Sequence, residues 1–189
     1  MEFEIVEIPW KHIIVDDFLN NEEYEKILNY IKSVYDFSKK VGYKEIHKHD
    51  SNSVISSIFC PKILLIKDLF FDKLNYGKKD LPKKYYPYIE LAILPPGYKY
   101  FKIHTDDCFK LMSIVYYFYP DLSTGTKLYT SHEKNSFHHS VDWVKNRALC
   151  FVSQQKDEYQ KTWHNYSNIS DSVRITFNLI LSTHETKPV

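Results

Sequence analysis

The sequence has few cysteines and no long apolar run, and each of these absences excludes a class of protein. Cys60, Cys108 and Cys150 are odd in number and widely spaced, so they form neither a zinc-binding pattern nor a disulfide framework. No stretch approaches 18 uninterrupted apolar residues. Glu2 and Glu4 interrupt the start of the chain, where a signal peptide would have a basic and then an apolar region. We therefore expect a soluble, cytoplasmic protein that does not enter a membrane.

The chain also lacks an excess of charge of either sign. It has 25 basic and 24 acidic residues, which gives a net charge of +1. The basic footprint typical of nucleic-acid-binding proteins is therefore missing. A length of 189 residues with 43% hydrophobic residues suits a single domain over residues 1–189. Monomer and homodimer both remain open.

The two parts of the chain differ in pattern. Residues 1–84 predict helical support: an edge strand over 2–8, a helix capped by Asn20 or Asn21, and a second helix that begins at Pro61. With Asn20 as the cap, Glu23 would complete a capping box. Residues 37–55 are polar, and we expect a loop or an irregular hairpin there. Residues 85–184 predict short strands near 88–94, 99–106, 111–119, 126–130, 137–143, 147–153 and 173–182. So many short strands without a later helix favour a closed or two-sheet β architecture.

His104 and Asp106 form a His-x-Asp motif after a Pro-Pro-Gly turn at 95–97. On a strand, side chains two residues apart point to the same face, so both could reach one metal ion. Taken alone the motif is weak, because the chain has nine histidines and 24 acidic residues. A polar strand residue is then the simpler interpretation of His104.

His164 and Arg174 strengthen the metal hypothesis. Two imidazoles and one carboxylate can occupy one face of an octahedral Fe(II) ion and leave three positions open. The last predicted strand alternates between an apolar face (Val173, Ile175, Phe177, Leu179, Leu181) and a polar one (Arg174, Thr176, Asn178). An arginine and a threonine on one face could bind the carboxylate of a 2-oxoacid. A surface arginine on a half-exposed strand is the alternative interpretation.

Together these residues resemble the signature of the 2-oxoglutarate/Fe(II)-dependent dioxygenase superfamily, in particular its prolyl hydroxylase-like branch. The order His-x-Asp, His and then Arg ten residues on carries the resemblance. Segments 12–19, 113–118 and 146–151 resemble, respectively, the opening of that branch, the strand that supplies a tyrosine to the co-substrate, and the strand that runs up to the distal histidine.

The resemblance implies a mainly β (α+β) fold, a double-stranded β-helix or jelly roll, with the N-terminal helices packed outside one sheet. It implies Fe(II) held by His104, Asp106 and His164. It also implies 2-oxoglutarate held by Arg174, with Tyr117 or Thr176 as a second contact. The expected reaction is hydroxylation of a substrate C–H bond by O2, with 2-oxoglutarate converted to succinate and CO2 and ascorbate as an auxiliary reductant. A small-molecule or peptidyl substrate is expected, with a slight preference for peptidyl proline.

The sequence departs from this branch at three positions. Leu94 and Phe101 stand where prolyl hydroxylases often have tyrosine, and Gly125 stands alone where a glycine pair is common. Ile180 stands where the nucleic-acid-demethylating branch has a second arginine, so the resemblance to that separate branch fails. None of these changes removes a metal ligand, but those at 94 and 101 alter the pocket that would hold the substrate.

Two other readings remain. One is a non-catalytic jelly-roll or cupin-like module that binds a metal or ligand, and the other is a cupin-type metalloenzyme that uses no 2-oxoacid. Among the other candidates, His47 and His49 are expected in a solvated loop, with their role left open, and Asp107 is the local rival of Asp106.

Overall fold

Two antiparallel sheets dominate the protein, as expected for a mainly β fold. The computed structural model describes residues 2–36, 45–49, 53–74, 84–99, 101–153 and 161–184. The large sheet has the order β1 (Glu2–Val6), β2 (His12–Asp16), β8 (Ala148–Val152), β5 (Lys110–Tyr119), β10 (Arg174–Ser182), β4 (Tyr86–Leu94) and β3 (Glu45–His49). The small sheet has the order β7 (Phe137–Val141), β6 (Thr126–Tyr129) and β9 (Trp163–Tyr166).

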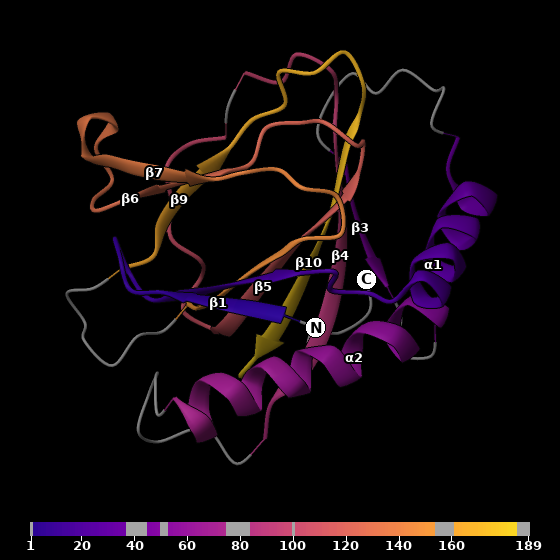
Figure 1. Cartoon of the computed structure of the whole chain (residues 1–189), viewed down its shortest axis with the longest axis horizontal. Coiled ribbons are helices and arrows are strands. Elements are labelled where there is room, and N and C mark those ends of the chain that lie inside the picture. The colour runs from indigo at the N-terminus through magenta and orange to yellow at the C-terminus, as the bar shows by residue number, and fades with distance from the viewer. Residues whose placement is uncertain are drawn as a thin grey trace.

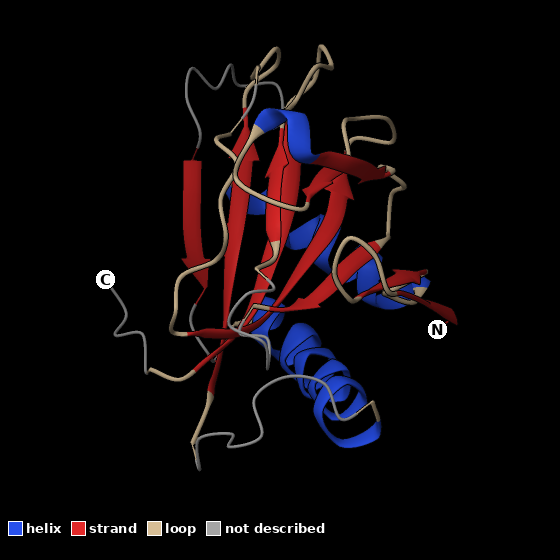
Figure 2. Cartoon of the chain, turned by 90° about the vertical axis from the view of Figure 1, so that its left-hand side faces the viewer, coloured by secondary structure: helices blue, strands red, loops and turns tan. Residues whose placement is uncertain are grey.

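The sheets and helices form layers, which are consistent with a β-sandwich covered by helices on one side. Figures 1 and 2 show the small sheet on one side of the large sheet and the helices α1 (Asn21–Val34) and α2 (Val54–Lys67) on the other. One apolar cluster joins the helices to the large sheet, and a second one, around Trp10, Phe151 and Leu128, lies between the sheets. None of the helices in the described ranges is both long and apolar enough to cross a membrane.

Strand β10 contributes to both the core and the cavity, because its apolar and polar residues alternate as predicted. Val173 and the odd-numbered residues to Leu181 are buried in the helix-side cluster. Arg174, Thr176 and Asn178 face the other way and line a cavity between the sheets. Period-two alternation therefore separates the core from the cavity wall, as the sequence predicted.

Both predicted helices are present, but the second begins earlier than expected. Asn20 caps α1 with the predicted capping box, since its side chain accepts from the Glu23 amide and Glu23 accepts from the Asn20 amide. The prediction that α2 begins at Pro61 is wrong. The helix is capped by Ser53 and contains Pro61 in its interior. The side chains of Ile55, Phe59, Ile63 and Ile66 are buried, and their burial offsets the roughly 3 kcal/mol that an interior proline costs. A π-helical segment, η1 (Asp68–Lys73), continues it.

Six predicted strands are confirmed within a few residues, as β4, β5, β6, β7, β8 and β10. The prediction of a regular strand over 99–106 is wrong for the described residues of that range, where an isolated bridge forms at His104. A second isolated bridge, at Tyr98, lies just before the range. A short 3-10 turn, η2 (Lys134–Ser136), precedes β7.

The N-terminal part contributes more to the sheets than expected. Strand β1 confirms the predicted edge strand, and β2 and β3, which were not predicted, also join the large sheet. Residues 1–84 are therefore not only helical support. The segment at 37–55, predicted as a loop or an irregular hairpin, contains β3, which pairs with the distant strand β4 along residues 89–93. Its polar sequence gives no apolar alternation, and the open edge of β4 supplies the hydrogen bonds that order it. The rest of that segment at 37–44 and 50–52, and the side chains of His47 and His49, lie outside the described residues.

Candidate metal centre

The backbone brings His104 and His164 together. The segment that leads to His104 runs antiparallel to β9, and the two residues form a bridge. The His104 amide donates to the His164 carbonyl at 3.0 Å, and the His164 amide donates back at 2.9 Å. Paired residues on neighbouring strands point to the same face, so the two ring centroids lie only 4.4 Å apart.

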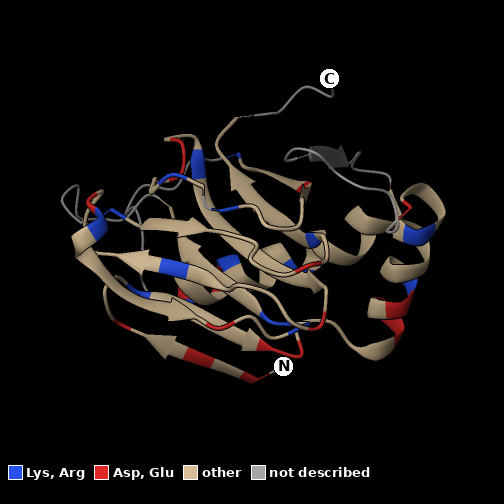
Figure 3. Ribbon diagram, turned by 90° about the horizontal axis from the view of Figure 1, so that it is seen from above, with Lys and Arg blue, Asp and Glu red and all other residues tan. Residues whose placement is uncertain are grey.

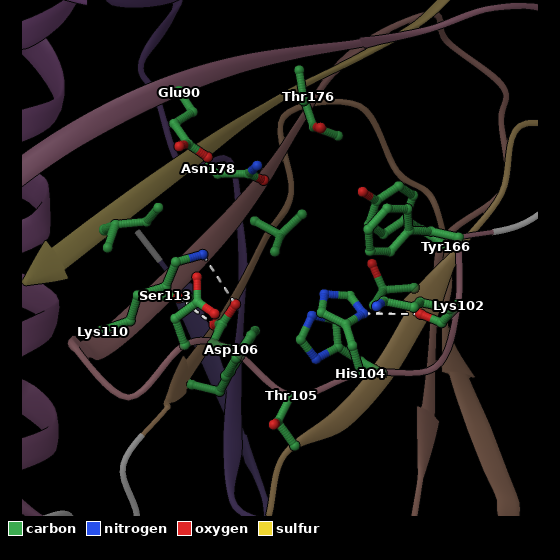
Figure 4. A pocket seen from close by; sticks show the side chains of 18 of the residues that line it. Glu90, Lys102, His104, Thr105, Asp106, Lys110, Ser113, Tyr166, Thr176 and Asn178 are labelled. Carbon is green, nitrogen blue, oxygen red and sulfur yellow. Dashed lines mark hydrogen bonds and ion pairs between the residues drawn. The ribbon is translucent and has the colours of Figure 1, made fainter. Parts of the chain in front are cut away.

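Asp106 completes the group, as the His-x-Asp spacing predicted. One ligand atom from each of His104, Asp106 and His164 lies within 4.8 Å of the others. These three form the one such group of histidine, cysteine or acidic side chains within the described ranges. Figure 4 shows His104 and Asp106 together on the cavity wall. This donor set fits one face of an octahedral Fe(II) ion.

Each histidine is held in the tautomer that a metal needs. The Nδ1 atom of His104 lies 3.0 Å from the Lys102 carbonyl, and that of His164 lies 2.8 Å from the Thr162 carbonyl. A carbonyl can only accept, so each Nδ1 carries the proton and each Nε2 keeps a free lone pair. Burial lowers the pKa of His104 to about 4, and burial also lowers the pKa of His164. Both imidazoles are therefore neutral near pH 7.

Asp106 is held ionised by its neighbours. Burial alone would raise the pKa of Asp106, but Lys110, His164 and two serine hydroxyls bring it down to about 2. Ser113 and Ser153 donate to the same carboxylate oxygen at 2.6 and 2.9 Å. Lys110 contacts the other oxygen at 3.2 Å. A neutral histidine pair beside an ionised carboxylate is the protonation state that binds a divalent cation.

Arg174 is a buried cation in the same cavity. Its side chain is 2% exposed. Its Nε donates to the Thr124 carbonyl at 3.2 Å, whereas Nη2 is buried with no hydrogen-bond partner in the described part of the chain. Burial lowers its pKa to about 10. A buried, incompletely paired guanidinium is costly, which an anionic ligand would remedy.

Aromatic rings surround the guanidinium of Arg174. Its Cζ lies 4.8 Å from the Trp143 ring centroid, 5.4 Å from that of Tyr166 and 5.9 Å from that of Tyr117. Such ring faces favour a cation. The three rings also cover the guanidinium with apolar surface. The N–H groups of Nη2 are therefore the polar groups that remain for a ligand.

The two predicted supporters of Arg174 differ in position. Thr176 lines the cavity. Tyr117 is fully buried, stacks on Trp143 at 4.7 Å and donates its hydroxyl to Thr126 at 2.8 Å. Thr126 and Tyr166 line the cavity, whereas Tyr117 does not border it. Tyr117 therefore lies behind Thr126 rather than on the cavity surface.

The cavity that holds these groups encloses about 420 Å³. Leu94 and Phe101, the two departures from the prolyl hydroxylase-like pattern, both line it. Phe101 stacks on Tyr166 at 5.1 Å. Asp107 also borders the cavity but is exposed and lies outside the metal-ligand group. Leu94 and Phe101 carry no hydroxyl group, so they add apolar surface to the wall of the cavity.

The sequence reasoning missed several residues of the site, among them Lys110, Ser113, Ser153 and Tyr166. The signal for Ser113 was present, because it shares a strand face with Tyr117, four residues on. The roles of Lys110, Ser153 and Tyr166 come from their contacts with Asp106 or Arg174. These contacts join residues that are distant in the sequence or that lie outside a predicted strand. No local pattern could have identified them.

Comparisons with solved structures identify the fold. The chain is similar to a prolyl-4-hydroxylase from Pseudomonas putida, with a TM-score of 0.61, 14% identity and coverage of 92% of this chain and 93% of that one. It is also similar to a viral collagen prolyl hydroxylase from Paramecium Bursaria Chlorella virus-1, solved as a 2-oxoglutarate complex, with a TM-score of 0.60, 18% identity and coverage of 92% and 96%.

A third similar structure is an oxidoreductase of the 2OG-Fe(II) oxygenase family from Burkholderia pseudomallei. Its TM-score is 0.61, its identity 8%, and the match covers 92% of this chain and 84% of that one. The sequence matches no protein-family model and no curated protein. At these identities the comparisons establish a shared fold over most of the chain, as the sequence resemblance implied.

Proposed function

We propose that the protein is a 2-oxoglutarate- and Fe(II)-dependent dioxygenase that hydroxylates a C–H bond of its substrate. The observation that carries this proposal is the shared cavity. The group His104, Asp106 and His164 and the unpaired Nη2 of Arg174 border one space of about 420 Å³. A cation site and a buried anion site in one cavity suit a metal ion and an acidic co-substrate together.

The three ligands have the chemistry that Fe(II) requires. His104 and His164 would each present Nε2, because their Nδ1 atoms are committed to backbone carbonyls. Asp106 would bring the one negative charge. Two serines and Lys110 hold its carboxylate in place, so that it need not be reoriented for each ion. When bound, Fe(II) with 2-oxoglutarate and O2 supplies the oxidation of the substrate and yields succinate and CO2.

Arg174 would bind the C5 carboxylate of 2-oxoglutarate. A charge-assisted hydrogen bond contributes about 1.5–3 kcal/mol, and more is gained because the buried Nη2 has no other hydrogen-bond partner among the described residues. Thr176 and Thr126 also line the cavity and could donate hydroxyl groups to the same carboxylate. Trp143 and Tyr166 pack around the guanidinium and would exclude water from the pair.

The arrangement of the sheets suits a double-stranded β-helix, the finer description of this sandwich. Two facing sheets leave a mouth where residues of both converge, and the metal ligands lie on the segment and strand that border it. We propose that residues 1–189 form one domain of this kind. Two similar structures are named as prolyl hydroxylases, which makes proline-containing peptides the first substrates to test.

A succinate assay tests the function. The purified protein would be supplied with Fe(II), ascorbate, 2-oxoglutarate and O2, alone and with candidate substrates. We expect slow succinate formation without substrate and faster formation with the right one. Asp106→Ala should abolish both. Undiminished turnover in that variant would contradict the metal assignment, and the absence of any succinate from the wild-type protein would favour a binding module instead.

A further inference from the structure

Three polar side chains of the large sheet face the cavity and form no hydrogen bond or ion pair with any side chain that the structure describes. Tyr88 and Glu90 lie on β4, and Asn178 lies on β10 directly opposite Glu90. All three line the cavity and are half-buried. None has a hydrogen bond or ion pair with any residue that the structure describes. Convergent polar groups without partners in a cavity are the usual mark of a ligand contact.

These groups lie near the metal end of the cavity. Ser113, which holds Asp106, is opposite Ile180 on β10, and Ile180 is opposite Tyr88 on β4. Glu90 and Asn178 form the next row of the sheet. Arg174 is four residues from Asn178, about 13 Å along the strand. In Figure 4, Glu90 and Asn178 lie beside each other and across the cavity from Asp106 and His104.

The cationic residues that line the cavity have other partners or are exposed, so none of them is paired with Glu90. Asp106 pairs with Lys110, and the proposed function commits Arg174 to 2-oxoglutarate. The two further charged residues of the wall, Lys102 and Asp107, are exposed. Glu90 is thus a half-buried carboxylate on the cavity wall that forms no ion pair with any side chain the structure describes. Partial burial of an unpaired carboxylate is unfavourable, and a bound cation would relieve it.

Figure 3 shows basic and acidic positions interspersed along the described elements. The negative charge of Glu90 also reaches Tyr88, whose pKa is raised first by burial and then by Glu90, Asp106 and Asp107. A cationic ligand group is therefore favoured at this row of the cavity, next to the proposed metal.

We propose that the substrate carries an ammonium or guanidinium group which Glu90 binds beside the metal, with the oxygens of Asn178 and Tyr88 as further acceptors. This inference rests on the proposed function and narrows its substrate class. In a peptide, the cation would be a lysine or arginine at, or next to, the residue that is hydroxylated. A prolyl substrate would then need a basic neighbour.

The test compares matched cationic and neutral probes. Two blocked peptides would each contain one proline, with a lysine immediately before or after it, and blocked lysine and blocked arginine would be tested alone. The same compounds with norleucine in place of the basic residue are the neutral controls. Substrate-dependent succinate formation would be measured for the wild-type protein, Glu90→Gln, Glu90→Asp and Asp107→Asn.

We expect at least one cationic probe to stimulate succinate formation and its norleucine counterpart to do so about tenfold less, as expected for loss of one charge-assisted contact. Glu90→Gln should raise the KM for that probe about tenfold and leave the KM for 2-oxoglutarate within about twofold. Glu90→Asp should restore part of the affinity, because it keeps the charge. Asp107→Asn, which removes a rim carboxylate, should change the KM for the probe by less than about threefold.

Several results would overturn the inference. These are stimulation by neutral probes alone, no stimulation by any cationic probe, equal effects of Glu90→Gln and Asp107→Asn, or an unchanged KM in Glu90→Gln. In all of these the wild-type protein would still form succinate without a probe. If the wild-type protein formed no succinate under any condition, the proposed function itself would fail, and the two failures are therefore distinguishable.

Discussion

His104 and His164 exchange backbone hydrogen bonds in both directions although 60 positions separate them in the chain. This pairing fixes the distance between the two imidazoles before any metal is bound. The metal site is therefore largely preorganised by backbone structure, and side-chain packing has to place only Asp106. Because the histidine pair is preorganised, the effect of a substitution near Asp106 on metal affinity can be distinguished from an effect on the fold.

The two serines that hold Asp106 give the first prediction. In Ser113→Ala, the carboxylate loses a hydrogen bond, so the pKa of Asp106 should rise. Metal affinity near neutral pH should fall about 10- to 100-fold, as for other residues that orient a ligand. The loss of metal on acidification should also begin at a higher pH than in the wild-type protein. Titration with Mn(II) between pH 5 and pH 8 would measure both effects.

Ser140→Ala is the matched control for that experiment, because Ser140 is exposed on β7 and far from the ligand group in sequence. It should bind Mn(II) like the wild-type protein. Equal metal affinity in Ser113→Ala and Ser140→Ala would show that the hydrogen bonds to Asp106 do not matter for the metal.

Replacement of Arg174 gives the second prediction. Arg174→Met removes a buried charge that lacks a full set of partners and keeps much of the side-chain volume. The metal-free protein should therefore be as stable as the wild type or more so, by about 1–3 kcal/mol. The stabilisation by 2-oxoglutarate, which mass action sets at about 2.7 kcal/mol at 100 times Kd, should disappear. Thermal unfolding with and without 2-oxoglutarate in the presence of Mn(II) would test both statements.

Mn(II) binding should survive Arg174→Met, because Arg174 is not in the metal-ligand group. Retention of 2-oxoglutarate binding in this variant would place the co-substrate elsewhere. Loss of both ligands together would indicate damage to the fold rather than to the anion site.

His12 gives a prediction about stability and pH. Its side chain is fully buried, and Nε2 has no hydrogen-bond partner among the described residues. Burial lowers its pKa from 6.5 to about 4; a hydrogen bond to the Trp10 carbonyl opposes this, and His139 and His138 add to it. The unfolded chain therefore binds one more proton than the folded protein between about pH 6.5 and pH 4.

Folding stability should then fall as the pH drops through this window, by up to about 3 kcal/mol from His12 alone. In His12→Phe this share of the pH dependence should be missing, whatever the absolute stability of the variant. Urea unfolding of the metal-free protein at pH 7, 6, 5 and 4 would show it. Parallel pH profiles for the two proteins would contradict the assignment.

The part of the site that the sequence predicted depends on local rules. His104 and Asp106 are two residues apart, and Arg174 and Thr176 alternate with apolar residues on one strand, so the period of two places each pair on one face. The family resemblance then linked these pairs to His164. The structure brings the three ligands together and places Arg174 and Thr176 on the same cavity.

The parts that could not be predicted depend on contacts between distant segments. Pro61 looks like a helix start by local preference, but the burial of Phe59 and Ile63 keeps it inside α2. Strand β3 has no apolar alternation and is ordered by the edge of β4. From the sequence alone, Glu90 is an ordinary polar strand residue. Its place in the cavity wall depends on the segments that form the opposite wall.

The central claim is that one cavity binds a divalent metal and 2-oxoglutarate together, and calorimetric titration of 2-oxoglutarate tests it most directly. With Mn(II) bound, we expect saturable binding of one 2-oxoglutarate per chain, which weakens at least tenfold without metal and is lost in Arg174→Met. Equal affinity with and without Mn(II), or unchanged binding in Arg174→Met, would contradict it.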